Sequence, residues 1–379
     1  MSRLHVYAVI VIIVVAVAST GAYYWFSRAP EKPFKPMALR VGHLLADQLH
    51  QPGWVVAKEE NYFADEGFEV VHKEYPYGSV EMEHFAAGEL DVAYVGAVPF
   101  LTARAAGVDV IAVASSNTEG SSLVVAEEIQ NVTDLDGKTI GSPGIGSIQD
   151  YMLDKVMADN NIEFSVHRAA VTLLLEKFST GEIDGYIAWE PHATRAVVEK
   201  IRGAHTLLTS HDILEGHQCC VVAVRGDWVR EAPYIVRRII RWHMKAMRWV
   251  LENSSEAEDL IASYSGLSIE LVQTAHPIVK HPYPTLVHAN SCRIMLEGQI
   301  EAGKIKSEDV PDIEEFLSEA IDNSFVEDLD KELKPPNSLG SYYEIWGLAL
   351  KWNVDASVET PRCPKISRVK DQNEEYHYL

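Results

Sequence analysis

The sequence is poor in cysteine and in basic residues. Only four of its 379 residues are Cys, and no two of them have the C-x-x-C spacing of zinc and dithiol sites. Lys and Arg together number 33 against 55 Asp and Glu, which gives a formal charge of −22. Because phosphate backbones are held by clustered Lys and Arg, this composition argues against a nucleic-acid-binding protein.

Metal and nucleotide motifs are absent as well. The 15 histidines show no H-x-H or H-E-x-x-H spacing. The turn SPGIGS at 142–147 lacks the Lys-Ser/Thr ending of a phosphate loop and the spacing of a dinucleotide fingerprint. Cys219 and Cys220 are expected to be small buried residues on a strand, pointing to opposite faces, which argues against a thiol nucleophile with His217 as its base. We therefore predict no catalytic residue, no metal and no cofactor.

One long apolar run is present, at the N-terminus. It extends over residues 6–26 after Arg3 and has about the ~20 residues that a helix needs to cross a bilayer. Ala16-Val17-Ala18 resembles a signal-peptidase site, so residues 1–27 are either a cleaved signal or an uncleaved signal anchor. We favour the anchor because apolar residues continue past this site. In both cases the rest of the chain is expected to be exported, after a Pro- and Lys-containing spacer at 28–37.

Beyond the spacer, short apolar runs alternate with helical patterns, which predict, among others, a helix at 52–67, a strand at 68–75, a helix at 171–180 and a long helix at 229–253. A chain of this length can form two cores, since single cores stop growing at roughly 250 to 300 residues. The alternation predicts an α/β fold with two lobes, each a mainly parallel sheet flanked by helices. We expect lobe 1 at 38–117 plus 225–334, lobe 2 at 118–224 and an extension at 335–379. Chain crossovers near 116–121 and near 224–227 would then form a hinge over a cleft.

An internal similarity supports two lobes of one plan. FAAGELDVAYVGAVPFLTARA at 85–105 and FSTGEIDGYIAWEPHATRA at 178–196 share a helix end, Gly-Glu, Asp, an apolar strand and a Pro-started helix. In an open parallel sheet, ligands bind outside the carboxyl ends of the strands, beside helix N-termini. The two copies should therefore face each other across one ligand site, with bare backbone at Gly96 and Ala97 and with an indole and a carboxylate at Trp189 and Glu190.

Several segments together resemble the solute-binding proteins of ABC importers, in the group for nitrate, sulfonates, taurine, bicarbonate and thiamine-pyrimidine precursors. They are PGWVVAKEENYFADEGFEV, GELDVAYVGAVPFL, GSPGIGS, GEIDGYIAWEPHATRA and CCVVAVRGDWV. The resemblance covers residues 39–325 in the family's order. The resemblance implies a type II periplasmic-binding-protein-like fold that closes on a small solute and delivers it to a membrane permease and its ATPase. It implies the following ligand-binding residues: His50, Gln51, Gly78, Ser79, Gly96, Ala97, Asn117, Ser147, Trp189, Glu190 and His217.

Three departures from the family pattern leave alternatives open. No Cys for lipid attachment follows the apolar run, His192 follows the Trp-Glu-Pro segment, and the tail is long. The leading interpretation is a non-enzymatic, monomeric binding protein for a small anionic or zwitterionic solute, outside the cytoplasm. A pyrimidine-precursor synthase on the same fold is the first alternative, although it should be cytosolic and carry a cysteine-rich iron-binding run. A membrane-anchored sensor or interaction domain that uses the tail is the second.

Overall fold

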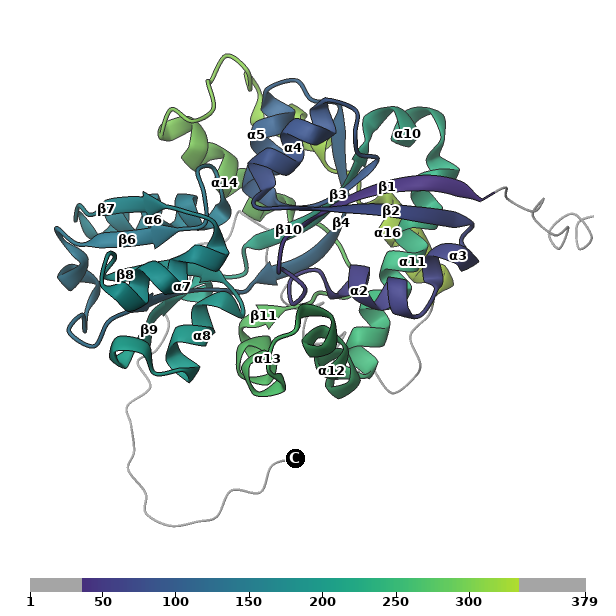
Figure 1. Cartoon of the computed structure of the whole chain (residues 1–379). Helices are drawn as coiled ribbons and strands as arrows, with labels where there is room; N and C mark the ends of the chain where they lie inside the picture. The colour runs from purple at the N-terminus through teal and green to yellow at the C-terminus, as the bar shows by residue number, and fades with distance from the viewer. Residues whose placement is uncertain (1–35, 334–379) are drawn as a thin grey trace, which may run out of the picture. The chain divides into compact units, whose positions relative to one another are not determined.

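The computed structural model describes residues 36–333, which contain two β-sheets flanked by helices (Figure 1). The first sheet has the strand order β11-β4-β10-β3-β1-β2 and the second β7-β6-β8-β5-β9. The strands of the first sheet are β1 (Met37–Leu44), β2 (Phe68–Tyr75), β3 (Val92–Gly96), β4 (Val110–Glu119), β10 (Gln218–Arg225) and β11 (Val279–Lys280). Those of the second are β5 (Ser121–Val125), β6 (Thr139–Ser142), β7 (Ser165–Arg168), β8 (Gly185–Trp189) and β9 (His205–Thr209).

Both sheets combine parallel and antiparallel pairs. β1 pairs in parallel with β2 and β3, and β6 pairs in parallel with β7 and β8. β10 runs antiparallel to β3 and β4, and β5 runs antiparallel to β8 and β9. The predicted α/β class with two sheets is confirmed.

Helices follow most strands, as the alternating pattern predicts. In the first half of the chain they are α2 (Pro52–Glu59), α3 (Tyr62–Asp65), α4 (Gly78–Ala86) and α5 (Ala97–Ala105). Around the second sheet they are α6 (Ile148–Asn160), α7 (Val171–Thr180), α8 (His192–Val198) and α9 (Ser210–Ile213). The single helix expected from residue 52 to Gly67 is broken into α2 and α3, because Asn61 adopts a left-handed conformation with φ 57°.

Strand β3 shows how the first sheet is buried on both faces. Tyr94 points toward helix α11 (Pro233–Glu252), where its hydroxyl lies 2.9 Å from Nδ1 of His243. Its neighbour Val95 belongs to the apolar cluster that contains Phe85 of α4 and Phe100 of α5. Successive side chains of a strand point to opposite faces, so α4 and α5 cover one face of this sheet and α2, α3 and α11 the other (Figure 1).

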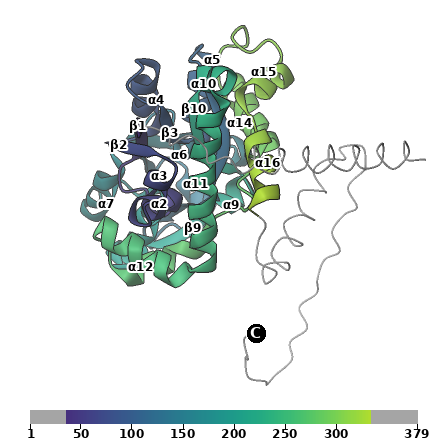
Figure 2. The ribbon, with the colours of Figure 1, turned by 90° about the vertical axis from the view of Figure 1, so that its right-hand side faces the viewer.

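The C-terminal helices return to the first sheet. They are α10 (Gly226–Glu231), α11, α12 (Ser254–Ser265), α13 (Ile269–Ala275), α14 (Ala289–Glu301), α15 (Ile313–Ala320) and α16 (Ser324–Glu332). The helix expected over 229–253 is two helices, because Ala232 before Pro233 leaves the helical region. Helices α11 and α16 lie side by side (Figure 2), and α16 was not predicted.

The chain crosses from the first sheet to the second at Gly120, between β4 and β5, within the range predicted for the first crossover. Our second expected crossover, near 224–227, is wrong. Strand β10 was assigned to lobe 2, but it lies between β3 and β4 in the first sheet, so the chain returns between β9 and β10. The apolar pattern of β10 fits either sheet, and only strand pairing decides. We propose corrected lobes of 38–119 plus 218–333 and of 121–217.

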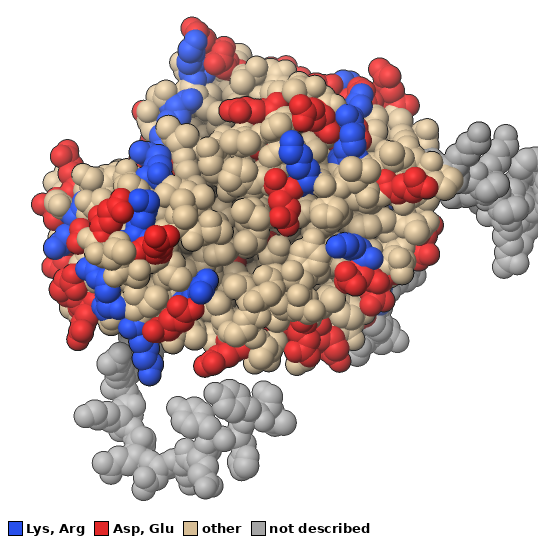
Figure 3. All heavy atoms as spheres, viewed as in Figure 1, with Lys and Arg blue, Asp and Glu red and all other residues tan. Residues whose placement is uncertain are grey.

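Three expected segments lie outside the described residues: the N-terminal anchor or signal at 1–27, most of the spacer at 28–37, and the extension at 335–379. Among residues 36–333, no helix combines the length and the apolar character that a membrane span needs. On the face drawn in Figure 3, Lys and Arg are interspersed with Asp and Glu rather than gathered in one basic patch.

Candidate functional site

A small pocket lies where the two sheets meet. It encloses about 20 Å³, which is room for about one water-sized group. Its lining comes from both sheets and consists of Leu44, Asp47, His50, Tyr77, Gly78, Gly96, Pro99, Ser147, Ile148, Gln149, Trp189, Cys219 and Cys220. The two similar segments thus meet here, since Gly96 ends β3 and Trp189 ends β8.

Five of the predicted binding residues line this pocket, and six do not. The five are His50, Gly78, Gly96, Ser147 and Trp189. The six others are Gln51, Ser79, Ala97, Asn117, Glu190 and His217, which lie close by in sequence or space but are not part of the lining.

Glu190 illustrates why a predicted residue is not in the lining. Its Oε1 accepts a hydrogen bond of 2.6 Å from the Ser122 hydroxyl, and its Oε2 accepts one of 3.0 Å from the Thr194 amide. Burial raises the pKa of this carboxyl group, against the hydrogen bonds from Ser122 and Thr194 that lower it. Glu190 therefore ties the start of α8 to β5, and its side chain is satisfied without a ligand.

The other residues outside the lining mostly support the loops around the pocket. Gln51 donates to Oδ2 of Asp47 (3.1 Å) and to the Tyr94 carbonyl (2.9 Å). Asn117 accepts a hydrogen bond of 3.0 Å from the Cys220 amide. The Ser79 hydroxyl reaches the Ile145 carbonyl at 3.4 Å, which links α4 to the Gly-rich turn.

His217 and Ala97 complete the set outside the lining. Nδ1 of His217 contacts the Leu214 carbonyl at 2.9 Å, and its buried Nε2 has no hydrogen-bond partner among the described residues. Ala97 is buried as the first residue of α5.

The second lobe lines the pocket with Trp189 and with Ser147, the residue before α6. The Trp189 side chain is 3% exposed, and its Nε1–H has no hydrogen-bond partner among the residues that the structure describes. Ser147 caps α6, with its hydroxyl accepting from the Asp150 amide at 3.0 Å. The first amides of a helix have no intrahelical acceptor and carry the positive end of the helix dipole. This side of the pocket is thus suited to an acceptor or an anion.

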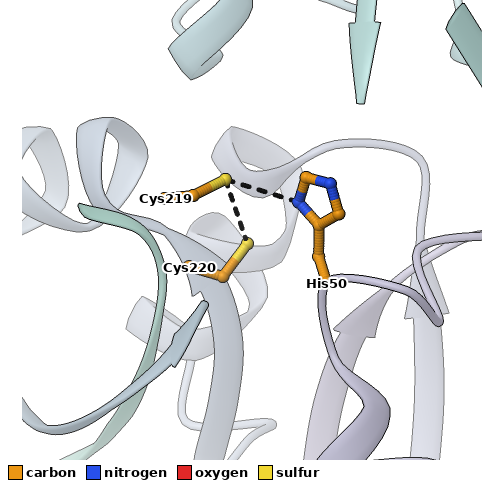
Figure 4. A group of neighbouring side chains, drawn as sticks. All are labelled: His50, Cys219 and Cys220. Carbon is orange, nitrogen blue, oxygen red and sulfur yellow. Dashed lines mark hydrogen bonds between the residues drawn. The ribbon is translucent and has the colours of Figure 1, made fainter. Parts of the chain in front are cut away.

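The opposite side contains a polar cluster that the sequence analysis missed (Figure 4). Sγ of Cys219 lies 3.4 Å from Nδ1 of His50 and 4.0 Å from Sγ of Cys220. Asp47 adjoins both, with Oδ1 3.7 Å from Nδ1 of His50 and Oδ2 3.9 Å from Sγ of Cys220. All four side chains are buried.

The expectation that Cys219 and Cys220 point to opposite faces is wrong. The pairing of β10 with β4 shifts register on both sides of Cys220, which is a β-bulge. A bulge adds a residue to one strand and redirects its side chains, so the two sulfur atoms lie together. The expectation that both cysteines are small buried residues on a strand is confirmed, since both are buried in β10 and belong to the apolar cluster that contains Val95. The sulfur of Cys219 also lies beside the imidazole of His50.

Burial and neighbouring groups shift the pKa values of this cluster. A hydrogen bond from Cys220 holds the pKa of the Cys219 thiol well below its usual range. Burial raises the pKa of Asp47. For His50, burial opposes the charged form, but attraction by Asp47 and Cys219 outweighs it and the pKa is raised to about 9. These shifts favour the charged form of the His50 imidazole beside the thiolate of Cys219.

Comparison with known proteins agrees with the fold. Residues 33–264 match the model of the NMT1-like family. A protein of Brucella abortus (strain 2308) named "Putative binding protein" is 23% identical over 232 residues, which cover 60% of this chain and 71% of that protein. The names of these relatives describe binding proteins rather than enzymes.

Two solved structures are similar in fold. The periplasmic nitrate-binding protein NrtA from Synechocystis PCC 6803 has a TM-score of 0.69 at 13% identity, covering 80% of this chain and 90% of that one. The alkanesulfonate-binding protein SsuA from Xanthomonas axonopodis pv. citri, bound to MOPS, has a TM-score of 0.64 at 18% identity, covering 76% and 99%. With its two α/β sheets, its pocket where they meet and a family match over more than half its length, this chain belongs to the NMT1-like family.

Proposed function

We propose that this protein is the solute-binding component of an ABC importer, working outside the cytoplasm and capturing a small anionic or zwitterionic solute. The observation that carries the proposal is the pocket, to which both sheets contribute lining residues. A ligand held there would contact both lobes at once, and its binding energy could therefore favour closure.

We infer the class of solute from the hydrogen-bond donors at the pocket. The unpartnered indole N–H of Trp189 and the amides at the start of α6 would receive the oxygen atoms of a nitrate, bicarbonate or sulfonate group. The similar proteins named for nitrate and for alkanesulfonates are consistent with such a group. Because the pocket holds only about one water-sized group, we expect the lobes to separate before the solute enters.

Delivery to a permease and its ATPase is part of the proposal, since a binding protein of this kind acts by presenting its closed form to a membrane complex. The N-terminal apolar run would keep the protein at the membrane surface if it is not cleaved. We propose that the protein binds solute as a monomer, because both sheets that line the pocket come from one chain.

The test uses the full chain in a mild detergent with nitrate, bicarbonate, taurine and a series of alkanesulfonates. A solute that binds the native state raises the unfolding temperature, and calorimetry then gives its affinity. Trp189→Phe keeps an aromatic ring but removes the N–H. It should weaken binding about 10-fold or more, since hydrogen bonds to charged groups contribute about 1.5–3 kcal/mol.

A pair of cap variants separates ligand binding from stability. Ser147→Ala and Ser268→Ala each remove a hydroxyl that caps a helix, of α6 and α13 respectively. Both should destabilise the protein by about 1 kcal/mol, but only Ser147→Ala should also weaken solute binding. Absence of stabilisation by every member of the panel would overturn the proposed function.

A further inference from the structure

The cluster of His50, Cys219 and Cys220 has the dimensions of a metal site. One ligand atom from each residue lies within 4.8 Å of the other two. Around a tetrahedral zinc ion, with Zn–S near 2.3 Å and Zn–N near 2.0–2.1 Å, two sulfur ligands are roughly 3.8 Å apart and a sulfur and a nitrogen roughly 3.5 Å. The observed separations are 4.0 Å and 3.4 Å, so one ion could contact all three atoms with little movement.

The orientation of His50 is that of a metal ligand. Its Nε2 lies 2.7 Å from the Gly120 carbonyl. Because a carbonyl only accepts, Nε2 carries a proton, so Nδ1, which lies beside the sulfur of Cys219, is the ring nitrogen that can bind a metal once its own proton has left. Metal-binding histidines almost always donate their other ring N–H to a carbonyl or carboxylate, which sets the tautomer and the ring direction.

Asp47 adjoins these three ligand atoms. Its Oδ1 lies 3.7 Å from Nδ1 of His50 and has no hydrogen-bond partner among the described residues, although it is buried. A buried oxygen of this kind normally has a partner. Its other oxygen, Oδ2, accepts a hydrogen bond from Gln51 (3.1 Å), as ligating carboxylates commonly do.

Side-chain hydrogen bonds that are not part of the regular strand pairing stabilise the β-bulge. The Cys220 amide donates to Oδ1 of Asn117 (3.0 Å), and Nε2 of Gln218 donates to the Cys220 carbonyl (2.8 Å). A regular strand would separate the two sulfur atoms across the sheet. The local structure therefore stabilises the one arrangement in which both thiols face His50.

We propose that Cys219, Cys220, His50 and Asp47 bind one thiophilic cation of tetrahedral preference, with Zn²⁺ as the reference ion. Two sulfur, one nitrogen and one oxygen ligand in this arrangement favour zinc over calcium or magnesium, which prefer oxygen. On binding, the protons that the cysteines, Nδ1 of His50 and the Asp47 carboxyl group hold leave to solvent. The pocket lining has no Lys or Arg, so the ion would also supply positive charge for an anionic solute; this consequence alone rests on the proposed function.

The experiment is a cobalt titration of the full chain in mild detergent, reduced and stripped with a chelator. We expect one equivalent of Co²⁺ to bind with a thiolate-to-cobalt charge-transfer band, and Zn²⁺ to displace it. Cys219→Ser and Cys220→Ser should each reduce the band, since one thiolate remains, and weaken binding by at least about 100-fold, the upper end of losses seen for supporting residues. The matched control is Cys292→Ser. Cys292 is another buried cysteine, on α14 and in the apolar core, so this variant should keep the charge-transfer band and the affinity for cobalt. Cys363 is present in every variant, so any contribution that it makes to the signal is the same in all of them.

A measurement on the unmodified chain guards against variants that fail to fold. X-ray absorption of the zinc-loaded protein should show two sulfur ligands near 2.3 Å and two nitrogen or oxygen ligands near 2.0–2.2 Å. A shell without sulfur, or a band that Cys292→Ser reduces as much as Cys219→Ser does, would overturn the site. Solute titrations run in parallel keep the two proposals apart. Solute binding without metal binding overturns the metal site alone, and metal binding without any solute binding overturns the proposed function alone.

Discussion

Glu81 is a fully buried carboxyl group on α4, the helix that also carries the pocket residue Gly78. Neither of its oxygens has a hydrogen-bond partner among the described residues. Burial, and then the nearby Asp47, raise the pKa of Glu81 well above its usual value. The folded state therefore holds a proton on Glu81 at pH values where the unfolded chain has released it.

The sign of the pH dependence follows. Above the unfolded pKa and below the folded one, the native state binds one more proton than the unfolded state, so the free energy of unfolding falls as pH rises, by up to about 1.4 kcal/mol per pH unit. Glu81→Gln removes this dependence. We expect the variant to gain stability over the original protein as pH rises from about 5 to 8, measured by urea unfolding. Glu83→Gln, on an exposed position of the same helix, is the control, and an equal pH response in both variants would contradict the prediction.

At the scale of elements, the crossover from β4 to β5 helps to position His50, which lines the pocket. Glu119 and Gly120 both have positive φ, of 57° and 98°. The Gly120 carbonyl accepts a hydrogen bond from Nε2 of His50. A Cβ on Gly120 would lie 2.7 Å from Nε2 of His50. This glycine is thus required by its backbone and by the imidazole beside it.

We predict that Gly120→Ala lowers the free energy of unfolding by about 1–3 kcal/mol and weakens both solute and metal binding, because His50 must move. Gly216→Ala is the matched control. Gly216 also has positive φ, of 64°, but a Cβ there meets nothing within 4 Å. Chemical unfolding and titration of both variants should show similar backbone strain, with loss of binding in Gly120→Ala only. Equal binding in the two variants would contradict the assigned role of His50.

At the scale of the whole described chain, α6 of the second sheet touches α14 of the part that returns to the first. Lys304, after α14, forms ion pairs with Asp154 and with Asp150 (3.6 Å) of α6. The Tyr151 hydroxyl also reaches the Ile294 carbonyl at 3.5 Å. If the lobes separate as we propose, these contacts are broken, and they then favour the closed form.

Lys304→Gln should therefore shift the balance toward the open form. Partly exposed ion pairs contribute at most about 1 kcal/mol, so solute affinity should fall by no more than about 5-fold, and the loss should shrink at high salt. Lys306→Gln is the control, since Lys306 pairs with Glu308 close by in the same loop. X-ray scattering of both variants with and without solute provides the measurement. A larger radius for the Lys306 variant than for the Lys304 variant would contradict this role.

Much of the fold could be predicted because it depends on local pattern. Strand β2 and helix α7 were predicted with their observed ends, since each is bounded by a clear signal such as Gly181 after α7. The break at Asn61 and the extra helix α16 were missed, because a left-handed Asn and a short charged helix carry weak signals. The sheet that contains β10 could not be predicted, because an apolar strand fits beside many partners.

The amino-acid sequence by itself determined the order of strands and helices, the duplicated segment and the placing of Gly96 and Trp189 at strand ends, because hydrophobic periodicity and turn residues act over a few positions. Only the tertiary structure decided which side chains meet. His50 and Cys219 are 169 positions apart, and their contact depends on β10 lying between β3 and β4 and on a bulge that turns both sulfur atoms the same way. Neither condition can be read from local pattern, since both result from long-range pairing of strands.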